Sequence, residues 1–212
     1  RKPLHLIGCH LRCLARSPAR YVETLRLALR SGRPGFKGLL YQIFYFAEAA
    51  VLADHLRKVG ATHLHNHFGH QSCSLAMLGS AMSGVPFSFT LHGPHELLEP
   101  YSWRLDLKAE RARFVACISS FARSQAMLVT RPVEWDGLHI VHCGVEPALY
   151  DARARSRDAR PTLLFVGRLA VQKGTPIPIE AFARVRAAHP DARLVIAGGG
   201  ELRAEMEARV AT

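Results

Sequence analysis

Histidines crowd one short part of this 212-residue chain, because six of its 12 histidines fall between residues 63 and 95. His63, His65 and His67 alternate along a strand-like run, so their side chains share one face. Three imidazoles so placed could ligate a metal ion, which makes a metal-dependent hydrolase one candidate function. Such sites usually add a carboxylate and histidines from later strands, and no further His-x-His group occurs in the sequence. We favour a structural role for the three.

His92 stands at the end of an apolar run, residues 86–92, and is followed by Gly93 and Pro94. In open α/β sheets, ligands bind outside the carboxyl ends of the strands. A neutral imidazole at that place can donate to a substrate oxygen, and Gly93 allows the backbone to approach a ligand closely. Taken alone, the feature is more typical of a histidine that caps a loop.

Two cations follow a second apolar run, since Arg168 ends residues 162–168 and Lys173 comes five residues later, before Gly174. Fixed cations at a strand end suit a diphosphate, to which a guanidinium gives a forked contact and an ammonium a point charge. We expect the preceding run, residues 163–167, to be buried, which argues against two merely solvated cations.

A third apolar run ends in Gly198, Gly199 and Gly200 and leads into a helix-like segment. Unblocked backbone N–H groups at a helix start suit an anionic or nucleotide ligand. The sequence does not follow the G-x-G-x-x-G pattern, because Leu202 and Arg203 occupy the later positions. A purely structural glycine turn explains it equally well.

These residues need a scaffold in which short strands alternate with helices. We predict strands at residues 62–68, 86–92, 114–119, 138–144, 162–168 and 192–199. We predict helices at residues 71–84, 103–112 and 176–189, with others starting near residues 120 and 201. This rhythm is typical of an α/β fold with mostly parallel sheets.

The polar stretch 145–161, bracketed by Pro147 and Pro161, is predicted to link a first domain, residues 1–144, to a second, residues 162–212. Two strands and barely two helices cannot cover both faces of a parallel sheet. We therefore expect the second domain to be incomplete here and the sequence to be part of a longer protein.

The composition is that of a globular protein, with 49% hydrophobic residues and 21% charged residues. Five cysteines without a C-x-x-C pair argue against a disulfide framework or zinc ribbon, and favour a reducing cytoplasm. We predict no signal peptide.

The long apolar stretch 39–56 contains Gln42, Glu48, Asp54 and His55, so we expect a largely buried helix and not a membrane span.

Positive charge gathers before the first predicted strand, where residues 1–60 hold 11 Lys and Arg against 3 Asp and Glu. Interleaved Leu, Val and Tyr predict basic helices with an apolar side. Three explanations remain open, namely an anionic membrane surface, nucleic acid, or simply an Arg-rich composition. Nucleic acid is the weakest, because no recognition motif with interleaved aromatic residues accompanies the charge.

Taken together and in order, these segments resemble family 4 glycosyltransferases of the GT-B fold. The matching motifs are "HLHNHFG", "GVPFSFTLHGPHE", "DLKAERARFVACISSFAR", "HIVHCGVEPALY", "LLFVGRLAVQKG" and "HPDARLVIAGGGELRAEME". Within the family, the sequence most resembles enzymes that build exopolysaccharides, such as colanic-acid-type transferases. The resemblance implies two Rossmann-like domains, the first for the acceptor and the second for a nucleotide sugar.

The resemblance also implies roles for single residues. His92 matches the family's cleft histidine beside the transferring sugar, and it is the expected catalytic residue. Arg168 and Lys173 are expected to hold the donor diphosphate, with Gly93 and the Gly198, Gly199 and Gly200 turn also on the donor side. The family's glycine-rich first loop is expected upstream of Arg1 and its Glu-x7-Glu motif beyond Thr212, so we expect residues 1–212 alone to be inactive.

The implied reaction retains the anomeric configuration and uses neither a metal nor another cofactor, since the nucleotide sugar is a substrate. The implied partners are a nucleoside-diphosphate sugar and a saccharide or polyprenyl-linked acceptor, with peripheral contact to an anionic membrane and no nucleic acid. The expected location is the cytoplasm, at the inner face of the plasma membrane.

Overall fold

The structure is a computed structural model that describes residues 3–150 and 160–211. The chain separates into two compact units, residues 1–145 and 146–212, and each is described by itself below. Of the predicted linker 145–161, residues 151–159 lie outside the described part of the chain.

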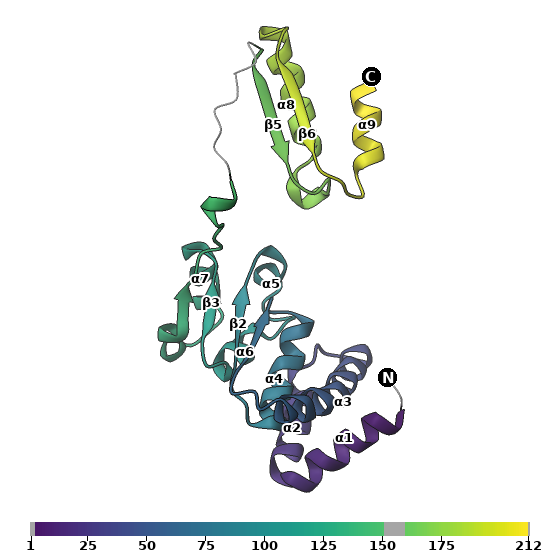
Figure 1. The fold of residues 1–212 in the computed structure, drawn as a ribbon, viewed down its shortest axis with the longest axis vertical. Helices are drawn as coiled ribbons and strands as arrows, with labels where there is room; N and C mark the ends of the chain where they lie inside the picture. Colours follow the sequence, from purple (N-terminus) through teal and green to yellow (C-terminus); the bar gives the residue numbers. More distant parts are fainter. Residues whose placement is uncertain (1–2, 151–159, 212) are drawn as a thin grey trace. The chain divides into compact units, whose positions relative to one another are not determined.

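The first unit begins with three helices, α1 (Pro3–Arg16), α2 (Pro18–Ser31) and α3 (Phe36–Lys58). Four short strands follow, β1 (Leu64–His67), β2 (Phe87–Leu91), β3 (Val115–Cys117) and β4 (Leu138–Ile140). They form one parallel sheet in the order β1-β2-β3-β4 (Figure 1). Between them run the helices α4 (Gln71–Ser83), α5 (Pro94–Leu98), α6 (Leu105–Arg111) and α7 (Ser120–Met127), and a 3₁₀ turn at Pro132–Gly137. The predicted α/β class with a parallel sheet is confirmed.

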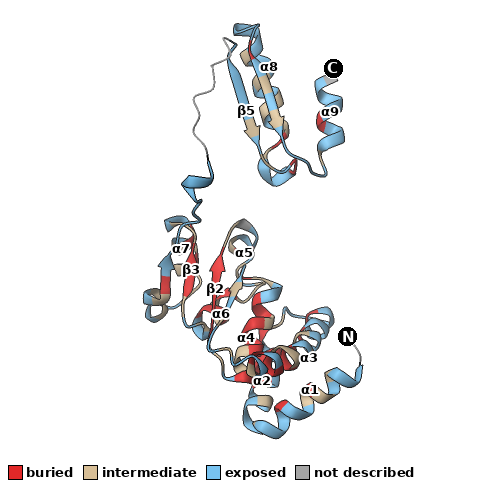
Figure 2. Ribbon diagram, viewed as in Figure 1, coloured by how far each residue is buried: buried red, intermediate tan, exposed pale blue. Residues whose placement is uncertain are grey.

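The core of this unit lies around β2 and α4 (Figure 2). Every residue of β2 is buried, as expected of an inner strand with both faces covered. Helix α4 is apolar nearly all round because it packs against both the sheet and the N-terminal helices. It ends at Gly84, whose φ of 82° is the left-handed conformation that glycine adopts at helix ends.

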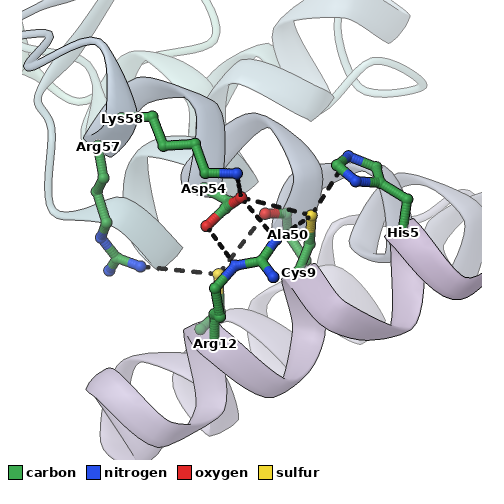
Figure 3. A network of polar contacts seen from close by, with 8 residues as sticks. His5, Cys9, Arg12, Ala50, Asp54, Arg57 and Lys58 are labelled. Carbon is green, nitrogen blue, oxygen red and sulfur yellow. Dashed lines mark hydrogen bonds and ion pairs between the residues drawn. The ribbon is translucent and has the colours of Figure 1, made fainter.

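A buried carboxylate ties α1 to α3 (Figure 3). Asp54 of α3 accepts hydrogen bonds at 2.9 Å from both Nε and Nη2 of Arg12 on α1, and pairs with Lys58 at 2.7 Å. The bond from Arg12 holds the pKa of Asp54 well below its usual range. Cys9 and Cys13 pack beside this carboxylate, and all five cysteines are unpaired thiols.

Helix α3 differs from its expected burial. Its second half packs against α1 and α4, but its first half exposes apolar side chains, among them Phe36 (79%), Tyr41 (60%) and Phe44 (58%). The helix has the length and hydropathy of a membrane span, and only 28% of that apolar window is buried in the first unit. The prediction of a largely buried helix for residues 39–56 is therefore wrong for residues 39–44, where all side chains but Gln42 are exposed.

The second unit contains a short 3₁₀ turn (Pro147–Leu149) and a two-stranded parallel sheet, β5 (Thr162–Val166) with β6 (Arg193–Ala197). A 3₁₀ turn (Val171–Lys173) and helix α8 (Pro176–Ala188) connect the strands, and α9 (Arg203–Ala211) follows β6.

The expected burial of residues 163–167 is wrong. Leu164 is 65% exposed and Val166 is 72% exposed, because a sheet of two strands with few helices around it cannot cover both faces of β5. Figure 2 shows the same contrast, since β5 and α8 carry little of the buried colour that marks β2 and α4.

Candidate active site

Two histidines meet at the carboxyl edge of the first sheet. His67 is the last residue of β1, and the register places it opposite Thr90 of β2, so that His92 lies just beyond the end of β2. The two rings are joined by a hydrogen bond of 2.7 Å between His67 Nδ1 and His92 Nε2. Because one nitrogen donates and the other accepts, this bond fixes complementary tautomers for the two rings. The predicted catalytic residue therefore has an imidazole partner.

Glu96 holds the backbone beneath this histidine pair. Its carboxylate is buried and accepts from the backbone N–H of His92 at 2.5 Å and of Gly69 at 3.0 Å, with a longer contact to the N–H of Gly93. Glu96 thereby joins the loop after β1 to the loop after β2. Gly93 itself has no atoms within 4 Å of where a Cβ would stand, so a ligand can approach its backbone.

Lys108 of α6 also supports the loop after β1. Its Nζ donates to the carbonyl oxygens of Gly69 at 2.8 Å and His70 at 2.9 Å. Burial lowers the pKa of Lys108 to about 8, and burial raises the pKa of the nearby Cys73 thiol to about 12.

Between His67 and Gly69, Phe68 has a φ of 71°, a left-handed conformation that costs an aromatic residue energy. Glu96 and Lys108 hold this strained turn in place.

His63 and His65 point to hydroxyl groups of the neighbouring strand. Ser88 Oγ lies 2.7 Å from His63 Nε2 and 2.7 Å from His65 Nδ1, and Thr90 Oγ1 lies 2.9 Å from His65 Nε2. Burial lowers the pKa of His65, with the neighbouring histidines acting in the same direction. Within residues 3–150 and 160–211, no three His, Cys, Asp or Glu side chains are placed to hold a metal ion. The hydrogen bonds of His63 and His65 to Ser88 and Thr90 support the structural role.

In the second unit, Arg168 and Lys173 lie on the loop that follows β5. Both are exposed, and within the described residues neither side chain forms an ion pair or a hydrogen bond. The loop is braced from inside by buried Thr175, whose hydroxyl accepts from the N–H of Ala170 at 3.0 Å and contacts its carbonyl at 2.8 Å. Two uncompensated cations on a braced loop can attract a dianionic group such as a diphosphate.

The glycine turn after β6 packs against this cationic loop. Leu169 donates to the carbonyl of Gly199 at 2.9 Å, and Leu202 donates to the carbonyl of Leu169 at 3.0 Å. A Cβ at Gly198 would collide with the carbonyl oxygen of Gly167, and one at Gly200 with that of Leu169. Gly198 and Gly200 thus allow two backbones to touch, whereas a Cβ at Gly199 would meet nothing within 4 Å. The geometry leaves Gly199 as the glycine most open to a ligand.

Sequence reasoning singled out His92 but missed Glu96, Lys108 and Phe68. The role of Glu96 could have been predicted from the sequence. A Glu at the third position of a helix commonly accepts from the backbone N–H of the residue that caps the helix, here Gly93. Lys108 gave no such signal, since it contacts a loop 39 residues away.

The first unit is a parallel α/β unit with a histidine at its carboxyl edge, and the second carries two cations after a strand, which is consistent with a fragment of the GT-B fold. Residues 6–149 match the model of Glycosyltransferase Family 4, and residues 149–212 match that of Glycosyl transferases group 1. The chain belongs to glycosyltransferase family 4.

Two kinds of curated relative are similar to this chain. A GDP-mannose-dependent alpha-(1-6)-phosphatidylinositol dimannoside mannosyltransferase of Mycobacterium tuberculosis is 40% identical over 102 residues, which are 44% of this chain and 26% of that protein. A D-inositol 3-phosphate glycosyltransferase of Acidothermus cellulolyticus is 29% identical over 180 residues, which are 73% of this chain and 40% of that protein. The chain therefore matches less than half the length of these relatives.

Proposed function

We propose that the full-length protein transfers a sugar from a nucleoside-diphosphate sugar to a saccharide or lipid-linked acceptor, with retention of the anomeric configuration. The observation that carries this proposal is the His67–His92 pair at the carboxyl edge of the parallel sheet, 2.7 Å apart, in the unit that matches Glycosyltransferase Family 4. Ligands of open α/β sheets bind at that edge.

In this proposal His92 contacts the transferring sugar. His67 fixes the tautomer of His92. The hydrogen bond from the backbone N–H of His92 to Glu96 fixes the position of His92. A held imidazole can donate to one hydroxyl of the sugar without rearranging, which is how preorganised groups favour a transition state. Gly93 leaves room beside it for the donor.

Arg168 and Lys173 would bind the donor diphosphate and stabilise the negative charge that develops as the nucleoside diphosphate leaves. Gly198, Gly199 and Gly200 would line the nucleotide side of that site. Under this scheme the two side chains supply the positive charge, and the reaction needs no cofactor, because the nucleotide sugar is itself a substrate.

GDP-mannose is the first donor to test, since one similar protein is named as GDP-mannose-dependent. Both kinds of relative carry inositol compounds in their names, so the acceptor class extends to polyols and their lipids. Assembly of cell-surface polysaccharide, with a polyprenyl-linked saccharide as acceptor, remains our proposal for the biological role.

We place this activity in the cytoplasm, at the inner face of the plasma membrane. The three N-terminal helices expose apolar side chains beside basic ones, such as Leu4 (83%) and Leu11 (60%) on α1 and Phe36 (79%) on α3. Anionic lipids attract basic surfaces, and apolar side chains enter the interface. The full-length protein should co-sediment with vesicles containing anionic lipid at low salt and much less at high salt. Failure to bind such vesicles at either salt concentration would remove the membrane part of the proposal.

The central test is calorimetry on the full-length protein with GDP, UDP and their sugar conjugates. We expect one nucleoside diphosphate to bind with micromolar affinity and its matching sugar conjugate to be consumed when a membrane extract supplies acceptors. Absence of both binding and consumption across the set would refute the proposed function.

A further inference from the structure

A cavity of about 340 Å³ opens in the first unit between α3, the start of α4 and residues 102–103. Its walls include the aromatic rings of Tyr41, Tyr45 and Trp103 and the polar side chains of Arg33, Gln71 and Ser74. Its volume is at the small end of the range for ligand pockets, which suits one sugar ring.

The cavity is connected to His92 by a series of aromatic rings. The ring of Trp103 lies 5.8 Å from that of His70, His70 lies 5.3 Å from Phe68, and Phe68 lies 4.7 Å from His92, centroid to centroid. The three steps together are comparable in length to two or three sugar units, which is the reach that an acceptor would need between the cavity and His92.

Three further features of this path indicate a ligand surface. His70 Nδ1 is buried and, within the described part of the chain, has no hydrogen-bond partner. Among the described residues other than glycine, Phe68 and Arg104 have positive φ, and both lie on this path or next to it. Unsatisfied buried polar atoms and held backbone strain are uncommon and gather at functional sites.

The chemistry of the cavity favours a neutral saccharide over an anion. Its one cation, Arg33, is occupied, since Nη2 pairs with Glu99 at 2.8 Å and the guanidinium stacks 4.5 Å above the Trp103 ring. The other polar groups are hydroxyls and amides, which exchange hydrogen bonds with sugar hydroxyls. Arg33 covers one face of Trp103, and the rings of Tyr41 and Tyr45 suit the apolar side of a sugar ring.

We propose that this cavity binds a sugar unit of the acceptor two or three residues away from the hydroxyl that is glycosylated. The substrate class is then an oligosaccharide-bearing acceptor and not a monosaccharide or a bare lipid phosphate. The proposal rests on the proposed function, because it assumes that transfer takes place at His92. Trp103 and Tyr41 are the specificity-determining residues, since both rings line the cavity.

The test uses the full-length protein with its preferred nucleotide sugar and a glycolipid extract from membranes of a strain that lacks the gene. Trp103→Ala should raise the amount of extract needed for half-maximal transfer at least tenfold, with less than a twofold change in the maximal rate and in nucleoside diphosphate affinity. Trp103→Phe should restore most of the loss, because it restores an aromatic face. Tyr41→Ala should act in the same direction and should fold, since Tyr41 is 60% exposed on a helix surface.

Tyr101→Ala is the matched control. Tyr101 is 70% exposed, lies two residues from Trp103 and does not line the cavity, so this variant should behave like the wild type. Unchanged acceptor dependence in both Trp103→Ala and Tyr41→Ala, with transfer intact, would overturn the cavity proposal alone. A wild-type protein that neither binds a nucleoside diphosphate nor transfers sugar would overturn the proposed function and the cavity proposal with it.

Discussion

Glu96 and Lys108 both bind the backbone of Gly69. The N–H of Gly69 donates to Glu96 at 3.0 Å, and the carbonyl of Gly69 accepts from Lys108 at 2.8 Å. Both side chains are buried, and each comes from a different helix, α5 or α6. The turn that carries His67 and Phe68 is thereby fixed by two buried side chains, while Phe68 itself stays 45% exposed.

Glu96→Gln should reduce sugar transfer by the full-length protein, chiefly through the maximal rate. The amide keeps one acceptor oxygen but places an NH₂ group against a backbone N–H, which costs about 1–3 kcal/mol. Thermal unfolding and steady-state kinetics measure the two effects. The control is Glu23→Gln, since the Glu23 side chain is 64% exposed and touches neither the turn nor the cavity. Equal kinetics for the two variants would exclude a positioning role for Glu96.

Lys108 should make stability depend on pH in the alkaline range. Burial lowers its pKa in the folded protein to about 8, below the ordinary value of 10.5, so the unfolded chain holds more protons between these two values. The free energy of unfolding therefore rises with pH over that window relative to a protein without this lysine. Denaturant unfolding at pH 7.5 and pH 10 gives the free energy of unfolding of the wild type and of Lys108→Met. The value for the wild type minus that for the variant should be more positive at pH 10 than at pH 7.5. A difference that stays constant or shrinks contradicts the assignment.

The three consecutive glycines should differ sharply when each is replaced by alanine. Gly198→Ala and Gly200→Ala force a Cβ against the carbonyl oxygens of Gly167 and Leu169, and such overpacking costs about 1–3 kcal/mol. Gly199→Ala meets no atom within 4 Å and should leave stability nearly unchanged. Thermal melting of the full-length variants ranks them. A loss of nucleotide affinity in Gly199→Ala with an unchanged melting temperature would identify Gly199 as a ligand contact.

Arg168→Ala and Lys173→Ala should each weaken GDP binding by roughly 1.5–3 kcal/mol, the scale of a charged hydrogen bond. Guanosine, which has no phosphate, should bind both variants as it binds the wild type. Arg184→Ala is a suitable control, because Arg184 is an exposed arginine of α8, away from the loop after β5. Calorimetry separates the outcomes, and equal losses for GDP and guanosine would mean that the cations do not hold the diphosphate.

The alternation of apolar runs with helical segments predicted the six strands and the helices α4, α6, α7, α8 and α9 within a few residues, but it gave no bounds for α1 and α2 and missed α5. Strand β4 is the clearest exception, since the run 138–144 forms a strand only at Leu138–Ile140. The pattern of apolar residues indicates local secondary structure, and it therefore placed His92 at the end of a strand. It could not locate the partner of His92, because the His67–His92 bond depends on the register of β1 against β2.

Burial was harder to predict than secondary structure. The same apolar pattern describes β2, which is buried throughout, and β5, which is mostly exposed, because burial depends on how many elements surround the strand. Helix α3 shows this within one element, as Ala49 and Ala53 are fully buried while Phe36 is 79% exposed. The cavity beside Trp103 was not predictable either, since its walls come from segments far apart in the sequence.

The most direct test of the whole account is transfer of labelled sugar by the full-length protein and its His92→Asn variant, with nucleoside diphosphate binding measured in parallel. Asparagine removes the imidazole that His67 orients but keeps a polar side chain of similar reach, and the backbone bond to Glu96 remains. The account predicts that transfer falls by about 100-fold or more, the usual scale for losing one preorganised group, while GDP affinity stays within about twofold of the wild type. Transfer within a few-fold of the wild-type rate would contradict it, because the reaction would then not depend on the histidine pair at the edge of the sheet.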